Sequence, residues 1–283
     1  MKGKEIMKKY ILILCLLLLA ACADQNEIKD NTPPRITILS SILIKEKEDL
    51  DVEKYFIIED ESSFSYTIEP LDTAIAGKGK LEIEAVDEYS NSSKAYLDYE
   101  VIPESSLLDV DYYNQYEVGA PLGCEGVCLY MALSYKNTME ITINEFLDTI
   151  PVSNISPYEG FMGSIYGPRE EGKLPAIYPE ALVKWGNQYG RTIDLSDSDL
   201  ITIEQYLSED SPVLVWITTR FEDPVMKTYD FGEVVENTHT VLLIGYDNDY
   251  IYYHDPISDA FQKIEIDRFM EIYQIMSFGA AVI

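Results

Sequence analysis

Cysteine, histidine and basic residues are scarce in this chain of 283 residues. Its four cysteines are too few for a disulfide framework like those of small secreted domains. Against 50 acidic residues there are only 21 lysines and arginines, so the formal net charge is −29. Such a chain repels nucleic acid and anionic lipid headgroups, and we expect neither as a partner. No stretch shows the alternating Asp and Gly of a calcium loop, so we expect the acidic residues on solvated faces.

A long transmembrane segment is also missing. The apolar run Ile11 to Leu19 is too short to remain in a bilayer, and it follows four lysines, which is the order of a signal peptide. A buried amino-terminal helix is the alternative, but the sequence turns polar from Ala23 to Pro34 and offers no second apolar face.

The end of this run, Leu19-Ala20-Ala21-Cys22, resembles the bacterial lipobox. The resemblance implies cleavage after residue 21 and a diacylglyceryl group on the Cys22 thiol. We therefore expect an extracellular lipoprotein held at the bacterial cell membrane. Removal of the signal peptide leaves a mature charge near −32, so the anchor must be lipid rather than a basic surface.

Composition divides the mature chain near Pro103. Residues 22–35 form a polar, lipidated tether, and residues 36–103 alternate apolar and polar side chains with the period of two that β-strands show. The segment Gly79 to Ser93 resembles the immunoglobulin-like repeats of bacterial surface proteins, and this resemblance implies a small β-sandwich that acts as a spacer. Residues 104–283 instead alternate helices with short apolar strands, so the whole chain is predicted to be α+β.

Several elements of residues 104–283 are specific enough to place. Thr142 with Glu145, and Thr202 with Gln205, have the spacing of capping boxes that open helices, and Pro179 suits a first helical turn. Apolar blocks bounded by turn residues predict strands, with one further helix at residues 267–275. The predicted strands are residues 213–218, 238–246, 250–254, 262–266 and 278–283.

Cys124 is a candidate nucleophile. Cys15 would leave with the signal peptide, so that only Cys124 and Cys128 remain as free thiols. A Gly- and Pro-containing loop delivers Cys124 to the start of an apolar helix, and a helix amino terminus favours the thiolate form. The simpler interpretation is that Cys124 is a small buried side chain, as most free cysteines are.

The two histidines, His239 and His254, fall in strands that a turn at residues 247–249 would place side by side. Asp255, directly after the second strand, could then orient the imidazole of His239. Nucleophile, base and orienting group would follow one another in chain order. Alternatively, His239 is a core residue with its hydrogen bonds satisfied, and Asp255 is a turn residue before Pro256.

These segments resemble the papain-like cysteine peptidases of family thirty-nine, which includes the double-glycine leader peptidases. The matching motifs are Gln115, Gly123-Cys124, His239 with Gly245-Tyr-Asp247, and Asp255-Pro256. Residues 178–182 and 211–217 match as well, so the resemblance extends from about Tyr112 to the carboxyl end. It implies a papain-like domain, with helices packed on an antiparallel sheet, that hydrolyses peptide bonds outside the cell through a thioester, without a cofactor or a metal.

The resemblance also implies individual roles. Cys124 would be the nucleophile, His239 the general base and then acid, and Asp255 the group that orients the imidazole. Gln115 and the backbone amide of Cys124 would donate to the oxyanion, at about 3 kcal/mol per donor. Asn114 is an adjacent substitute for Gln115. The chain departs from the family at Cys128, where relatives usually carry Ser, and at His254, where they often carry a small polar residue.

Two other functions are compatible with the same residues. The domain could have lost its chemistry and bind a peptide or protein partner at the cell surface. A zinc site is the third possibility, although the spacing fits no compact zinc module. Its ligands would be Cys124, Cys128, His239 and His254.

Overall fold

The computed structural model describes residues 30–283, so the predicted signal peptide, Cys22 and most of the tether lie outside the described residues. By compactness the chain divides into two units. Among the described residues, the first consists of residues 30–42, 51–71 and 80–98, and the second of residues 43–50, 72–79 and 99–283. In the described part of the chain, no helix has both the length and the apolar character needed to cross a membrane.

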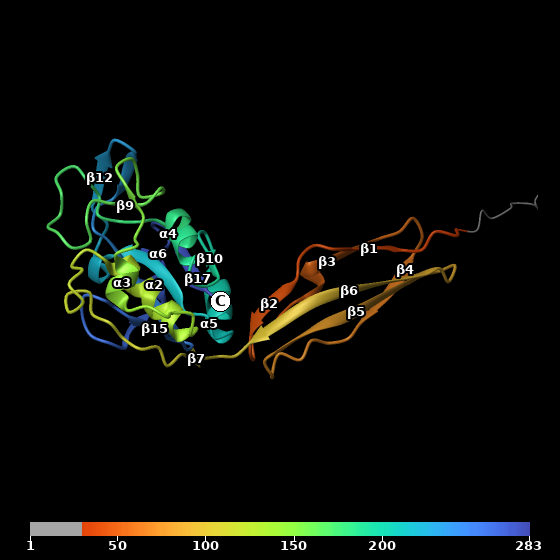
Figure 1. Cartoon of the computed structure of the whole chain (residues 1–283). Helices are drawn as coiled ribbons and strands as arrows, with labels where there is room; N and C mark the ends of the chain where they lie inside the picture. Colours follow the sequence, from red (N-terminus) through yellow and green to blue (C-terminus); the bar gives the residue numbers. More distant parts are fainter. Residues whose placement is uncertain (1–29) are drawn as a thin grey trace, which may run out of the picture. The chain divides into compact units, whose positions relative to one another are not determined.

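The strands before Pro103 form two small sheets (Figure 1). In one sheet β1 (Arg35–Ile38) pairs with β3 (Phe56–Glu59), which follows the short 3-10 helix η1 (Val52–Tyr55). The other contains, in order, β2 (Ile42–Lys45), β6 (Ser92–Ile102), β5 (Gly77–Asp87) and β4 (Phe64–Ile68). The period-two alternation predicted strands at β5 and β6, and its apolar positions in β5 are buried. That this region is an immunoglobulin-like spacer stays a prediction.

The second unit is built on a seven-stranded antiparallel sheet. Its order is β10 (Thr192–Asp194), β17 (Gly279–Val282), β11 (Val213–Thr218), β14 (Thr238–Tyr246), β15 (Tyr250–His254) and β16 (Gln262–Glu265), and β7 (Ser106–Leu107) also pairs with β14. Successive side chains of a strand point to opposite faces, and nearly every residue of β11 and β14 is buried. Both faces of the sheet centre are therefore covered.

Five helices accompany this sheet in the described part of the chain: α2 (Cys124–Tyr135), α3 (Ile143–Leu147), α4 (Pro179–Gly186), α5 (Leu200–Ser208) and α6 (Ile266–Tyr273). α2 is buried along its first ten residues and packs against β14 and β11. Because a helix that is apolar all round must be covered on all sides, α2 is the central helix of the unit. The fold is α+β, as the sequence predicted.

The helix starts show which local signals operate. Thr142 and Glu145 form the predicted capping box, each side chain bonding the other residue's backbone, and Pro179 is the first residue of α4. The prediction that Thr202 opens a helix is wrong. α5 begins three residues earlier, because the side chain of Asp199 accepts a hydrogen bond from the Thr202 amide.

Some short elements lie outside the predicted strands. They are the parallel pair β8 (Val152–Ser153) and β9 (Phe161–Met162), the hairpin of β12 (Met226–Tyr229) and β13 (Gly232–Val235), and the 3-10 helix η2 (Thr219–Phe221). Most residues of the hairpin are exposed, so no apolar pattern marks it in the sequence.

Candidate active site

Cys124 is the first residue of α2, as predicted. Gly123 precedes it as the helix cap, in a turn closed by a hydrogen bond from the Gly123 amide to the Ala120 carbonyl. At the first position of a helix, the backbone N–H of Cys124 has no acceptor within the helix. The residue is 8% exposed, so Cys124 lies near the edge of the core.

The surroundings of the thiol differ from the sequence-based expectation. We expected the helix amino terminus to favour the thiolate, but burial raises the pKa of Cys124 well above its ordinary value. The carboxyl group of Glu125 adds to this, both through its charge and through a hydrogen bond with the thiol (Cys124 Sγ to Glu125 Oε2, 3.1 Å).

His239 and Asp255 form a buried pair. The hairpin of β14 and β15 places Leu242 opposite His254, and Asp255 follows directly, so that Asp255 Oδ1 lies 2.7 Å from His239 Nε2. Burial by itself would raise the pKa of Asp255, but the hydrogen bond and the charge of His239 outweigh it and lower this pKa. An ionised Asp255 therefore holds the proton of His239 on Nε2 and leaves Nδ1 as the free ring nitrogen.

Gln115 is fixed beside the same pair by its backbone. Its amide N–H donates to the carbonyl of Pro256, next to Asp255, and its own carbonyl accepts from Ala120. In the side chain, Nε2 donates one hydrogen to the carbonyl of Pro121 at 2.5 Å, and Oε1 has no hydrogen-bond partner among the described residues. The second hydrogen of Nε2 is available to a ligand.

Cys124, His239 and Gln115 line one cavity of about 310 Å³. Its lining includes an ion pair between Arg169 and Glu236 (Nη2 to Oε1, 3.2 Å), which no sequence motif predicts. The remaining lining residues are Tyr116, Pro121, Leu122, Pro175, Thr219, Asn237, Thr238 and Ile257. Residues that carry a thiol, an imidazole and a carboxamide thus line one cavity.

Comparison with known proteins identifies the family of this domain. The model of the Peptidase_C39 like family matches residues 107–281, which is more than half of the chain. The chain belongs to the Peptidase_C39 like family. The uncharacterized protein YvpB of Bacillus subtilis (strain 168) is 28% identical over 215 residues, which are 70% of this chain and 81% of that protein.

A solved structure shows the same fold. It is a crystal structure from Bacillus anthracis named as a "putative C39-like peptidase", which matches 64% of this chain and 98% of its own with a TM-score of 0.56. The sequences are 22% identical, so this likeness concerns the fold alone. Within the C39-like domain, all four predicted site residues lie in the matched region.

The two departures from the family pattern have structural positions away from the cavity lining. Cys128 lies one turn beyond Cys124, fully buried, with its sulfur 3.5 Å from the Thr240 carbonyl. His254 donates from Nε2 to the Val110 carbonyl (2.8 Å) and accepts at Nδ1 from the Phe261 amide (3.0 Å). Both ring nitrogens of His254 are therefore engaged.

This geometry does not support the alternative zinc site. A zinc ligand needs a free lone pair, and the one lone pair of the neutral His254 ring is occupied by the Phe261 amide. The candidate ligands also do not converge: within residues 30–283, the only side chains grouped closely enough to share a metal ion are three aspartates.

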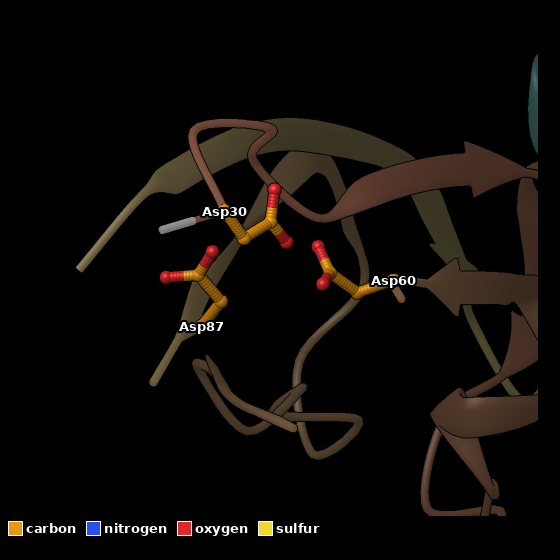
Figure 2. Close-up of side chains that lie close together, drawn as sticks. All are labelled: Asp30, Asp60 and Asp87. Carbon is orange, nitrogen blue, oxygen red and sulfur yellow. The ribbon is translucent and has the colours of Figure 1, made fainter. Parts of the chain in front are cut away.

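These aspartates, Asp30, Asp60 and Asp87, belong to the first unit, and Figure 2 shows their carboxylates turned toward a common space. Their ligand atoms lie within 4.8 Å of one another, an all-oxygen set of the kind that hard cations bind. Each carboxylate also accepts amide N–H groups of its own turn, so the cluster has a structural role without an ion. Sequence analysis missed it because the three residues come from separate segments.

Glu125 is a third feature of the structure that no sequence motif predicts. It is 1% exposed and directly follows the candidate nucleophile. Its only sequence signal is a carboxylate inside an otherwise apolar helix, which is typical of a residue with a specific buried role.

Proposed function

We propose that the C39-like domain hydrolyses peptide bonds, with Cys124 as the nucleophile. The observation that carries this proposal is the shared cavity: Cys124 and His239 line it together, and Asp255 holds the far nitrogen of the imidazole at 2.7 Å. A buried thiol alone is usually a core residue, whereas a thiol that opens onto an oriented imidazole has the means to react.

The proposed reaction has two halves. His239 Nδ1 takes the thiol proton, and the sulfur attacks the carbonyl carbon of the scissile bond. The oxyanion accepts hydrogen bonds from the Cys124 amide and the second Nε2 hydrogen of Gln115, and it collapses to a thioester as the amine leaves with the proton of His239. Water then attacks the thioester with His239 as base, which releases the acid and restores the thiol.

Thiol labelling tests the assignment. The mature protein, which by the proposed processing lacks Cys15 and carries lipid on Cys22, is treated with iodoacetamide, and the alkylated cysteine is identified by mass spectrometry of its peptides. We expect one fast-reacting thiol that Cys124→Ala removes and Cys128→Ala, the matched control one helical turn away, leaves in place. Fast labelling of Cys128, or none at Cys124, would contradict the assignment. Incubation with a mixed peptide library then detects hydrolysis that depends on Cys124.

A second candidate function is peptide or protein binding without turnover. The burial that raises the pKa of Cys124 favours it, because a neutral thiol is a poor nucleophile. A peptide from the library that is retained by the chain and remains uncut in both wild type and Cys124→Ala supports this function. Peptide cleavage by the wild type alone supports the peptidase.

We also propose that the domain acts at the outer face of a bacterial cell membrane, held by lipid on Cys22. The charged start, short apolar run and Leu-Ala-Ala-Cys sequence support this, and so does the polar segment that follows. Substrates or partners would then be extracellular peptides or proteins, with no nucleic acid among them.

A further inference from the structure

Glu125 is a buried carboxyl group without a cationic partner. No lysine or arginine forms an ion pair with it in the described part of the chain. Its Oε1 accepts a hydrogen bond from the Ile177 amide at 3.2 Å, and its Oε2 lies 3.1 Å from the Cys124 sulfur. Buried acids are normally paired with a base or bound to a metal, so the contact with a candidate nucleophile needs an explanation.

The setting of Glu125 makes both of its forms accessible near neutral pH. Burial raises the pKa of Glu125 to about 7. Four smaller effects lower this pKa: the backbone amide of Glu125, the Cys124 thiol, the Ile177 amide and the charge of His239. The hydrogen-bonded contact with sulfur therefore occurs in two states, one with a carboxylic acid and one with a carboxylate.

The neighbouring titratable groups come from several elements. Cys124 and Cys128 lie on α2, Tyr178 is the residue before α4, and His239 lies on β14 with Asp255 beyond it. Of these only His239 can carry a positive charge. A negative charge on Glu125 therefore raises the free energy of a thiolate at Cys124, and burial keeps water from screening that repulsion.

We propose that Glu125 controls the ionisation of Cys124. As a carboxylic acid it donates its proton in a hydrogen bond to the sulfur and permits the thiolate to form. As a carboxylate it disfavours the thiolate through charge repulsion. The thiol proton passes to His239 in either case, and Glu125 keeps its own proton in the reactive state. The control of Cys124 by Glu125 rests on the proposed role of Cys124 as nucleophile.

The test compares the full chain with its Glu125→Gln variant. Glutamine has nearly the same shape, accepts from Ile177, donates to sulfur and is neutral at every pH. The rate constant for iodoacetamide alkylation of Cys124 is measured from pH 5.5 to 8.5, with the alkylated peptide quantified by mass spectrometry. Glu180→Gln on the exposed face of α4 is the matched control.

We expect the ratio of variant to wild-type rate to be near 1 at pH 5.5 and to rise with a midpoint near pH 7. By pH 8.5 it should reach about tenfold or more, which corresponds to one unit of thiol pKa. Glu180→Gln should give a ratio near 1 throughout. A ratio that does not depend on pH would mean that Glu125 has only a structural role. A variant that reacts more slowly than wild type above pH 7 would mean that Glu125 is the base. Either result overturns the proposal.

Two provisions keep the test decisive. If Glu125→Gln does not fold, Glu125→Met supplies a second neutral side chain of similar volume. The proposal requires that a neutral group be tolerated at this position. Failure of both variants to fold would therefore overturn it. Alkylation needs no substrate turnover. A chain that cleaves no peptide but shows the expected ratio would therefore refute the peptidase and leave the control of Cys124 by Glu125 intact.

Discussion

At the scale of single residues, rarity made the site visible in the sequence. The chain has two histidines, and only two of its cysteines lie outside the predicted signal peptide and lipobox, so few combinations of nucleophile and base exist. The family motifs select Cys124 and His239 among them. Glu125 could not be found in this way, because it is one of 50 acidic residues and its role depends on burial. The pKa of Cys124 was wrongly predicted for the same reason: the helix start is local, whereas desolvation is a property of the packed structure.

His254 should make the folded state sensitive to mild acid. Burial lowers the pKa of His254 and outweighs its hydrogen bond to Val110. The unfolded chain therefore binds this proton at a higher pH than the folded chain. The stability that depends on neutral His254 is complete above about pH 6.5 and decreases as the pH falls toward the folded-state pKa.

Urea unfolding at pH 7.5, 6.0 and 5.0 measures this effect against His254→Gln. The wild type should lose more stability than the variant between the first and last pH, because the lowered pKa of the buried imidazole is present only in the wild type. Because the raised pKa of Glu125 acts in the opposite sense over this range, the difference between the two chains at each pH is the informative quantity. Equal pH dependence in both chains would show that His254 does not carry the effect.

At the scale of elements, strands were predicted better than helix starts. β11, β14 and β15 have the predicted bounds, because each is an apolar block enclosed by turn residues. The start of α5 was misplaced because Asp199 and Thr202 are both good caps, and the structure uses Asp199, whose side chain accepts a hydrogen bond from the Thr202 amide. The β12–β13 hairpin was missed because most of its side chains are exposed.

Gly245 belongs to the Gly-Tyr-Asp motif, and close packing in the structure explains why a glycine stands there. A Cβ atom at this position of β14 would lie 2.4 Å from the backbone oxygen of Ser106 in β7, closer than atoms can approach. Gly245→Ala should therefore displace β7 and destabilise the fold by about 1–3 kcal/mol. Thermal unfolding would show a lower Tm, by roughly 2–4 °C per kcal/mol.

The control for Gly245→Ala is Gly77→Ala. A Cβ at Gly77, in β5, meets nothing within 4 Å, so this variant should stay within about 0.5 kcal/mol of wild type. Equal Tm values for the two variants would contradict the proposed clash.

At the scale of the whole molecule, the predicted lipid anchor can be tested by its covalent chemistry. In bacteria that express the chain and are grown with labelled palmitate, the wild type should take up label and sediment with membranes, whereas Cys22→Ser should do neither. Cys15→Ser is the matched control, because Cys15 lies within the predicted signal peptide. Label retained by Cys22→Ser would refute the anchor and leave the C39-like domain unaffected.

The family and the α+β fold of residues 107–281 followed from motifs and apolar patterning, whereas the grouping of Asp30, Asp60 and Asp87 did not. Motif positions are read along the chain, but the approach of three separated turns is set by how the strands pair. Only a three-dimensional structure contains that information.

The placement of Cys124 on the central helix and of His239 on the central strand has a consequence for biosynthesis. During translation Cys124 is added to the chain well before His239 and Asp255. A nascent or truncated chain that stops before β14 therefore has the thiol of Cys124 but no imidazole to activate it. On the proposed mechanism, the imidazole needed to activate the sulfur is in place only after the last strands have joined the sheet, so a chain that stops before β14 should not hydrolyse peptides.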